Sequence, residues 1–172
     1  MTPSPFVLEH LPRAPAGPAL DHACGAGRHA LALARAGRVV HALDRDVARL
    51  GALAGAARDE GLAIRVACVD LERFPLPAAR YAVVVNTSYL DRARMPALLD
   101  ALVPGGVLLF ETFTVAQAAT GHPRNPAFLL QPGELRSLVG DLDVFAYREG
   151  AVEREGRVAH LASIAARRRL HG

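Results

Sequence analysis

Short apolar runs alternate along the chain with segments of helical periodicity. Most runs are bounded by glycine, proline or polar residues, as is usual for buried strands. Five of them predict strands, at residues 19–24, 38–43, 63–69, 81–85 and 107–110. Between the runs, apolar residues recur three or four positions apart, as in Val47, Leu50 and Leu53, and this spacing predicts helices that bury one face.

Two segments outside this pattern are expected to cover the sheet. Residues 1–18 predict a short helix, opened by Ser4-Pro5, followed by a proline-rich connector. Residues 113–131 have no regular period and contain two prolines, which predicts a long lid-like loop. At this length we expect a single domain over residues 1–172.

The last part of the chain predicts an antiparallel edge. After a helix at 131–139, the segments 142–147 and 158–166 flank a turn between Gly150 and Gly156, which is the pattern of a hairpin. With the preceding strands this predicts an α/β fold. It is a doubly wound, mostly parallel, seven-stranded Rossmann-like sheet with an antiparallel C-terminal hairpin strand.

Polar residues or glycine follow each predicted parallel strand. They are Cys24-Gly25, Asp44, Asp70, Asn86 and Glu111. Ligands of doubly wound sheets bind beyond the carboxyl ends of the strands, so we expect the binding site at this edge.

The composition excludes several kinds of chemistry. All 20 basic residues are arginine, so lysine Schiff bases, the phosphate-loop lysine and the Tyr/Lys pair of short-chain oxidoreductases are absent. The net charge is +3, but the arginines are scattered, and we do not expect nucleic acid as a partner. No apolar run suits a membrane span or a secretory signal, so we expect a cytoplasmic protein. Cys24 and Cys68 are expected to be reduced core thiols.

The first predicted strand leads into a glycine turn. Gly25 and Gly27 can adopt positive φ, and the sequence from Gly25 to Ala30 fits the dinucleotide pattern G-x-G-x-x-A. This pattern indicates a nucleotide-like ligand and does not by itself separate NAD from other nucleosides.

The wider set of motifs resembles a known family. Asp21 before the glycine turn, Asp44 and Asp70 after the second and third strands, and Pro104-Gly105-Gly106 before the fifth resemble the class I S-adenosylmethionine-dependent methyltransferases. More closely, the chain resembles the small TehB-like methyltransferases of the tellurite-resistance type. The segments that carry this resemblance are Cys24–Ala30, Asn86–Arg92, Phe110–Thr114, Arg124-Asn125-Pro126 and Leu129–Glu134.

The resemblance implies S-adenosyl-L-methionine as the cofactor and gives its residues roles. Asp44 would bind the ribose hydroxyls and Asp70 the adenine amine, while Leu71 would offer a backbone N–H to the ring. The methionine end would lie against Asp21, Ala23 and Gly25, with the Asn86 carbonyl near the ammonium. Gly27 and Arg45 complete the expected cofactor site. His22 stands where the family commonly has an aliphatic residue.

Each carboxylate or amide also has a structural alternative. Asp44 would cap the following helix unless Asp46 does so, and Asp21 would fix the glycine turn. Asp70 and Asn86 are equally compatible with turn-forming roles.

Methyl transfer from a sulfonium is an in-line displacement that requires no metal and depends mainly on positioning. The catalytic candidates are Tyr89, His122 and Arg124, with Glu111 a weaker general base. Their alternatives are a pocket wall for Tyr89, a solvated loop for His122 and a surface ion for Arg124. His29 is expected to be a packing or surface residue.

The expected function is therefore methyl transfer to a small-molecule acceptor that the motifs do not identify, and a homo-oligomer is one way to complete the cover of the site. Two other functions fit the pattern less well. One is a non-catalytic S-adenosylmethionine-binding or partner-binding protein, and the other is an NAD-linked oxidoreductase.

Overall fold

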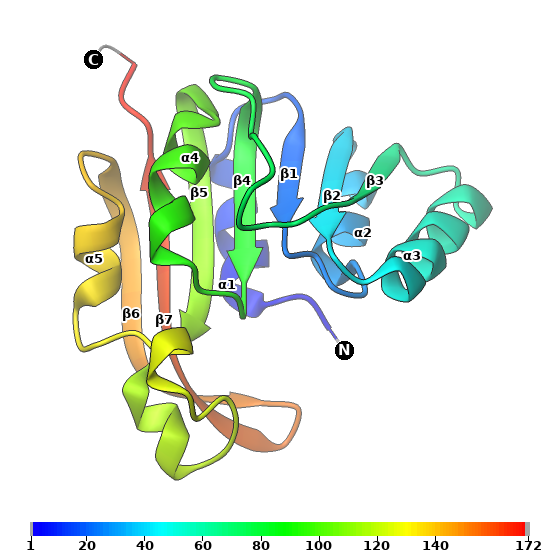
Figure 1. The fold of residues 1–172 in the computed structure, drawn as a ribbon. Coiled ribbons are helices and arrows are strands. Elements are labelled where there is room, and N and C mark those ends of the chain that lie inside the picture. The colour runs from blue at the N-terminus through cyan, green and yellow to red at the C-terminus, as the bar shows by residue number, and fades with distance from the viewer. Residues whose placement is uncertain (1, 171–172) are drawn as a thin grey trace.

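The computed structural model describes residues 2–170 as a seven-stranded sheet flanked by helices (Figure 1). The strand order is β3-β2-β1-β4-β5-β7-β6. Strands β1 to β5 are parallel, and β7 pairs antiparallel with both β5 and β6. The strands are β1 Ala19–His22, β2 Val40–Asp44, β3 Ile64–Cys68, β4 Tyr81–Thr87, β5 Leu102–Phe113, β6 Asp143–Arg154 and β7 Arg157–Arg167. The predicted fold class is confirmed.

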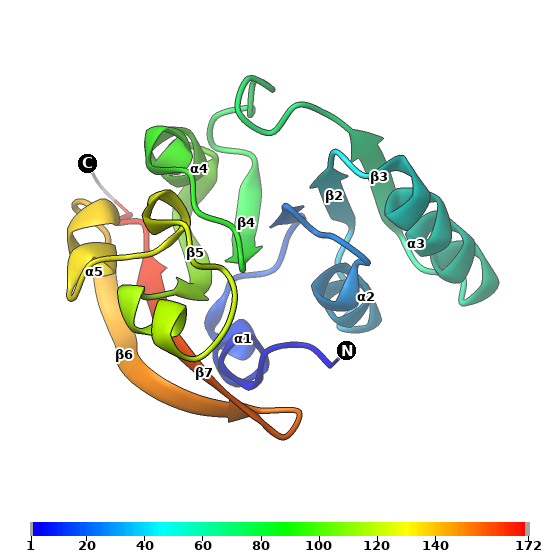
Figure 2. The same ribbon diagram turned by 60° about the horizontal axis from the view of Figure 1, so that its bottom comes forward.

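Helices cover the two faces of the sheet unequally. The helices are α1 Pro5–His10, α2 Arg28–Arg35, α3 Val47–Asp59, α4 Met95–Asp100 and α5 Glu134–Leu138. Helices α1, α2 and α3 lie on one face of the sheet, and α4 and α5 lie on the other (Figure 2). Buried side chains of α1, α2 and α3 form one cluster with the sheet, and those of α4 and α5 form another. Among the described residues, no helix is long and apolar enough to cross a membrane.

Strand β4 lies at the centre of this arrangement, and all seven of its residues are buried. Because side chains alternate along a strand, Val83 and Val85 enter the α1–α3 cluster while Val84 enters the α4–α5 cluster. The continuous apolar run at 81–85 therefore belongs to a strand that is covered on both faces, as is typical of such runs.

The hairpin is longer than its apolar pattern predicts. Strands β6 and β7 remain paired from Asp143↔Arg167 to Arg154↔Arg157, so the turn is reduced to Glu155-Gly156. Both turn residues have positive φ, which matches the twist of a two-residue hairpin. The distal pairs are exposed and partly charged, so backbone pairing rather than apolar periodicity sets their length.

The predicted lid-like loop contains local structure. Residues 113–131 hold two short 3₁₀ helices, η3 Val115–Ala119 and η4 Pro126–Phe128. A bridge between Thr114 and Leu130 closes the base of the segment. Such short turns have too few residues to show a period, which is why the sequence pattern missed them.

Candidate functional site

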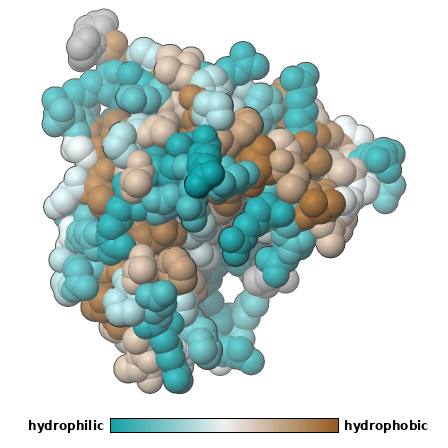
Figure 3. All heavy atoms as spheres, viewed as in Figure 1, coloured by the Kyte–Doolittle hydropathy of each residue, from teal (hydrophilic) through white to brown (hydrophobic). Residues whose placement is uncertain are grey.

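A cavity of about 890 Å³ lies beyond the carboxyl ends of the parallel strands. Its wall is formed by the residues after β1, β2 and β4, by the segment that follows β3, and by the lid segment 113–131. Figure 3, viewed as in Figure 1, shows the face that carries α4 and α5, with polar and apolar side chains interspersed and segment 113–131 projecting at the bottom. The volume lies within the usual range of small-molecule sites.

Only part of the predicted cofactor set reaches the cavity wall. The residues that do are Ala23, Asp44, Arg45, Asp70 and Leu71. Four predicted residues are not part of the wall. Of these, Asp21, Gly27 and Asn86 are buried, and Gly25 is half-buried.

Asp44 joins the cavity to the glycine turn. Its Oδ2 accepts a hydrogen bond from the Gly25 N–H at 2.7 Å, and its Oδ1 accepts one from the Asp46 N–H at 3.0 Å. The cap of α3 is Asp46, whose side chain accepts from the Arg49 N–H at 3.1 Å. A carboxylate has about four lone-pair sites, so Asp44 retains capacity for ligand hydroxyls.

Gly25 and Gly27 meet different requirements, although both have positive φ. Gly25, with φ of +55°, turns its N–H toward Asp44. A Cβ on Gly27 would lie 2.4 Å from Cδ1 of Leu53 on α3. Gly27 therefore allows close packing of the turn against α3.

Asp21 lies beneath the glycine turn and is 1% exposed. Its Oδ2 accepts a hydrogen bond from the Ala30 N–H, at 2.8 Å, in the first turn of α2. Burial raises the pKa of Asp21 to about 7, while the Ala30 hydrogen bond and the Arg28 charge oppose the rise. This geometry favours the alternative in which Asp21 holds the turn.

The raised pKa of Asp21 predicts a specific pH dependence of stability. Well below the unfolded pKa of 3.8 the side chain is protonated in both states, and between about pH 3.8 and 7 the unfolded chain loses this proton while the folded chain keeps it. The contribution of Asp21 to folding therefore falls as pH rises through this window. Relative to the wild type, Asp21→Asn is expected to gain at least about 1.4 kcal/mol between pH 4.5 and 8, the equivalent of one pKa unit.

Urea unfolding at several pH values measures this gain. The asparagine carbonyl can still accept the Ala30 N–H, so the comparison isolates the charge. Parallel stability curves for the two proteins would contradict the assigned burial of a titrating carboxyl group.

The buried residues His22 and Asn86 form a cluster with the half-buried Tyr89 at the ends of β1 and β4. Nδ1 of His22 and Oδ1 of Asn86 lie 2.9 Å apart, and the Asn86 amide donates to the Tyr89 carbonyl at 2.8 Å. The His22 and Tyr89 rings meet edge to face, with centroids 5.6 Å apart. His22 thus has a specific polar partner, and the cluster places Tyr89 on the cavity wall. The sequence offered no signal for this pairing beyond the unusual histidine.

Asp70 has both a turn-forming role and a place at the cavity. Its Oδ1 accepts from the Glu72 N–H at 3.1 Å, and its Oδ2 lies 3.8 Å from Nε of Arg73. The side chain is exposed and lines the cavity, whereas the neighbouring Leu71 is buried beside it. The two interpretations of Asp70 are therefore compatible.

The lid supplies an apolar side of the cavity. Phe113, Pro123, Ala127 and Phe128 line it. His122 and Arg124, on either side of Pro123, are exposed and are not part of the wall. Of the three predicted catalytic residues, only Tyr89 therefore lies at the cavity.

Arg92 anchors the lid, a role that the sequence did not reveal. Its guanidinium donates to both Glu134 carboxylate oxygens, at 2.5 and 2.9 Å, and to the carbonyls of Ala127 and Leu129, each at 2.9 Å. A bidentate carboxylate pair with two further carbonyl acceptors is a geometrically specific anchor. It ties the end of the lid to the start of α5.

A family model of the methyltransferase domain matches residues 19–106, just over half of the chain. The chain belongs to the methyltransferase domain family. The curated "Uncharacterized methyltransferase YodH" of Bacillus subtilis (strain 168) is 30% identical over 128 residues, which are 72% of this chain and 53% of that protein. The chain thus spans about half the length of this relative.

Solved structures show the same fold in other proteins. TehB from Haemophilus influenzae superposes with a TM-score of 0.82 and 21% identity, over 95% of this chain and 61% of that one. A geranyl diphosphate C-methyltransferase from Streptomyces coelicolor A3(2) gives a TM-score of 0.71 and 18% identity, over 95% and 78% of the two chains. The resemblance to TehB-like proteins is confirmed for the fold of this methyltransferase domain.

The two cysteines of the methyltransferase domain are free, but only one is in the core. Cys24 is buried, and burial raises the pKa of its thiol. Cys68 is exposed, so the expectation of a core thiol is wrong at this position. The reason is that β3 is the edge strand and is only partly covered.

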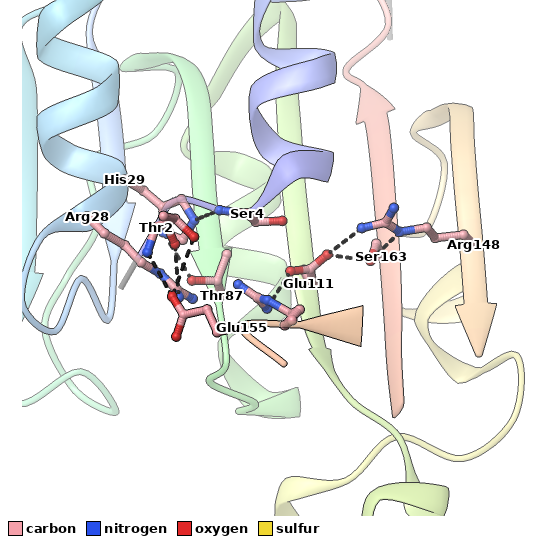
Figure 4. A network of polar contacts seen from close by, with 10 residues as sticks. Thr2, Ser4, Arg28, His29, Thr87, Glu111, Arg148, Glu155 and Ser163 are labelled. Carbon is pink, nitrogen blue, oxygen red and sulfur yellow. Dashed lines mark hydrogen bonds and ion pairs between the residues drawn. The ribbon is translucent and has the colours of Figure 1, made fainter. Parts of the chain in front are cut away.

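A polar network lies on the α1–α2 face of the domain, under the ends of β4 and β5 (Figure 4). The buried His29 accepts the Ser4 N–H at Nε2, at 3.0 Å, so its proton resides on Nδ1, 3.3 Å from Oγ1 of Thr87. Burial, with repulsion from nearby arginines, lowers the pKa of His29 to about 3. His29 is therefore a neutral packing residue that joins α1, α2 and β4.

Glu111 in the same network is 1% exposed and is not part of the cavity wall. Its carboxylate contacts Arg148 at 3.2 Å and Arg154 at 3.0 Å, and accepts a hydrogen bond from Ser163 at 2.7 Å. A carboxylate held in this way joins the hairpin to β5, and its geometry does not favour the weaker prediction of a general base.

Proposed function

We propose that this methyltransferase domain binds S-adenosyl-L-methionine in the 890 Å³ cavity and transfers the methyl group to a small acceptor. The observation that carries the proposal is the placement of Asp44 and Asp70, from the ends of two neighbouring strands, on the wall of one cavity. The cofactor has a sulfonium, an ammonium and a ribose diol but no pyrophosphate, and carboxylates complement these groups.

The cofactor would extend along the carboxyl ends of the strands. Asp44 would bind the ribose hydroxyls with its free lone pairs, while Asp70 and Leu71 would contact adenine. Ala23 and Arg45 border the same space. The other four predicted residues would contribute indirectly, by holding the glycine turn and the end of β4 in place. They are Asp21, Gly25, Gly27 and Asn86. The streptomycete methyltransferase with this fold was solved with S-adenosyl-L-homocysteine, which supports the assignment.

Catalysis in such a site rests on alignment and exclusion of water. Tyr89 is the catalytic candidate that borders the cavity, and burial raises the pKa of its phenol, so it would act as a hydroxyl group that orients the acceptor. His122 and Arg124 would take part only if the lid turned them inward. The apolar lid wall, with Phe113 and Phe128, suits a small acceptor.

The distribution of charge and the exposed lid bear on the partners of the proposed enzyme. Charged residues of both signs are dispersed along the chain, which supports a small-molecule acceptor rather than nucleic acid. The proposed enzyme would act in the cytoplasm. A second copy of the chain would be one way to close the cavity beside the exposed Phe128.

A thermal-shift experiment with two aspartate variants tests the cofactor. S-adenosyl-L-homocysteine at 100 times its Kd is expected to stabilise the wild type by about 2.7 kcal/mol, and NAD is expected to have no effect. Asp46→Ala should lower stability by about 1 kcal/mol through loss of the α3 cap and keep the ligand shift. Asp44→Ala should lose the shift.

Asp46→Ala is the matched control because it removes a neighbouring carboxylate that is not part of the cavity wall. A shift with NAD alone, or an unchanged shift in Asp44→Ala, would overturn the proposal. A protein that binds the cofactor without turnover would give the same shifts, and formation of S-adenosyl-L-homocysteine across an acceptor panel separates it from an enzyme.

A further inference from the structure

A second cavity, of about 620 Å³, lies at the opposite end of the sheet. The segments that enter β1, β2 and β4 surround it, together with the start of β3. Its wall includes Gly17, Arg38, Val39, His41, Arg65 and Arg80. In Figure 1 these strands begin at the top and run downward, away from this cavity and toward the proposed methyl-transfer site.

The wall of this second cavity is held in place by hydrogen bonds. Arg38 donates from Nη1 to the carbonyls of Pro15 and Gly17, at 2.8 and 3.2 Å, and from Nη2 to the Ala14 carbonyl at 3.1 Å. These bonds fix the proline-rich connector against the start of β2. The cavity is thus built from an ordered connector and from strand ends.

His41 has a defined orientation in the wall. Its Nδ1 lies 3.0 Å from the Tyr81 hydroxyl, and the two rings meet edge to face, with centroids 5.5 Å apart. Over residues 2–170, no hydrogen-bond partner is found for Nε2 of His41. The Tyr81 contact therefore leaves one ring nitrogen available to a ligand.

The charge of the wall is positive and uncompensated. Arg65 is paired in register with His41, and Arg80 directly precedes β4. Neither guanidinium contacts a carboxylate within the described part of the chain, and none of the residues lining this cavity is acidic. Several other arginines do have such partners, as in Arg35–Glu60 and Arg92–Glu134.

The electrostatic environment of His41 reflects the positive charge of these two arginines. Burial lowers the pKa of its imidazole, and repulsion from Arg80 and Arg65 lowers it further. Both guanidinium charges are therefore close enough to act on the ring, and no carboxylate offsets them. An anion bound between the two arginines would relieve this repulsion.

The C-terminal end of α2 also borders the cavity, and exposed carbonyls there would oppose an anion. Their acceptor capacity is largely occupied by the chain itself. The carbonyls of Ala32, Leu33 and Ala34 accept from the N–H groups of Ala36, Arg38 and Gly37, respectively. The unpaired guanidiniums therefore dominate the polar character of the wall.

We infer that this second cavity binds a phosphate group, either as inorganic phosphate or as the monoester of a small molecule, through Arg65, Arg80 and His41. The planar fork of a guanidinium matches two phosphate oxygens, and an imidazole N–H supplies a further donor. The cavity has room for a small organic group beside the phosphate. The inference is independent of the proposed methyl transfer, because the two cavities lie at opposite ends of the sheet.

Titration with inorganic phosphate and with ribose 5-phosphate tests this site, at constant ionic strength, by the NMR signals of the His41 ring. His41→Gln identifies those signals. Both ligands are expected to shift them saturably in the wild type. The double variant Arg65→Ala/Arg80→Ala is expected to raise the Kd of both phosphate ligands at least tenfold. Saturation of the wild type with S-adenosyl-L-homocysteine is expected to leave these Kd values unchanged.

Arg58→Ala/Arg157→Ala is the matched control, since it removes two exposed arginines outside this cavity and the same total charge. It should leave the Kd unaltered. An equal loss of affinity in both double variants would show that only the net charge of the protein matters, and it would overturn the inference. The absence of a saturable shift in the wild type would also overturn it. If ribose 5-phosphate binds more tightly than inorganic phosphate, the site recognises an organic monoester. If the two ligands bind equally, the site recognises the phosphate group alone.

Discussion

Glu111→Ala is expected to lower the free energy of unfolding by about 3–5 kcal/mol, because it leaves Arg148 and Arg154 without their shared buried anion. The Ser163 hydroxyl loses its acceptor in the same step. Arg148 is partly open to solvent, which favours the lower end of this range. Urea unfolding near neutral pH measures the loss.

The control for Glu111→Ala is Asp143→Ala, which breaks the pair with Arg169. Both partners of that pair are largely exposed, so the expected cost is below about 1 kcal/mol. Glu111→Gln should recover part of the stability, because the amide keeps an acceptor in the network. A loss below about 1 kcal/mol in Glu111→Ala would show that the network does not hold the hairpin to β5.

Gly27→Ala is expected to cost about 2–4 kcal/mol. The alanine must adopt a φ near +77°, at a penalty of about 1–2 kcal/mol, and its methyl group would overlap the Leu53 side chain. Chemical denaturation measures the difference. Because the strained contact with Leu53 lies outside the cavity wall, the loss of stability should be measurable in the absence of any ligand.

Two comparisons separate strain from a general effect of alanine. Gly51→Ala, in the exposed part of α3, meets no atom within 4 Å and should be neutral or stabilise by up to about 1 kcal/mol. In a double-mutant cycle, Leu53→Ala should cost less when Gly27 is already alanine, since it removes the overlap. Additive losses would contradict the assigned contact.

The central part of the sheet was predictable because strands β4 and β5 are covered on both faces. Tyr81–Val85 and Val107–Phe110 are continuous apolar runs, and each ends near a polar residue that reaches the carboxyl edge. The hairpin ends in the edge strand β6, whose residues are all half-buried or exposed, so its apolar pattern stops long before its backbone pairing does. Local patterns therefore located the strands but not the full length of the ribbon.

Sequence spacing predicted which residues come together, but not which way their side chains point. Asp21, Asp44 and Asp70 all lie near the glycine turn or strand ends as expected, yet Asp21 is buried beneath α2 while Asp70 is exposed. The difference depends on what packs over each carboxylate, which is a tertiary property. The same holds for Gly27, whose neighbour Leu53 is distant in sequence.

The arrangement in which Asp46 caps α3 while Asp44 faces the cavity has an evolutionary consequence. Position 46 is under selection for capping of the helix N-terminus, so serine, threonine or asparagine can replace aspartate there. Under the proposed function, position 44 is under selection for binding of the cofactor. Two neighbouring acidic residues can thus diverge independently, and a lineage adapting to a new temperature can adjust one while inheriting the other unchanged.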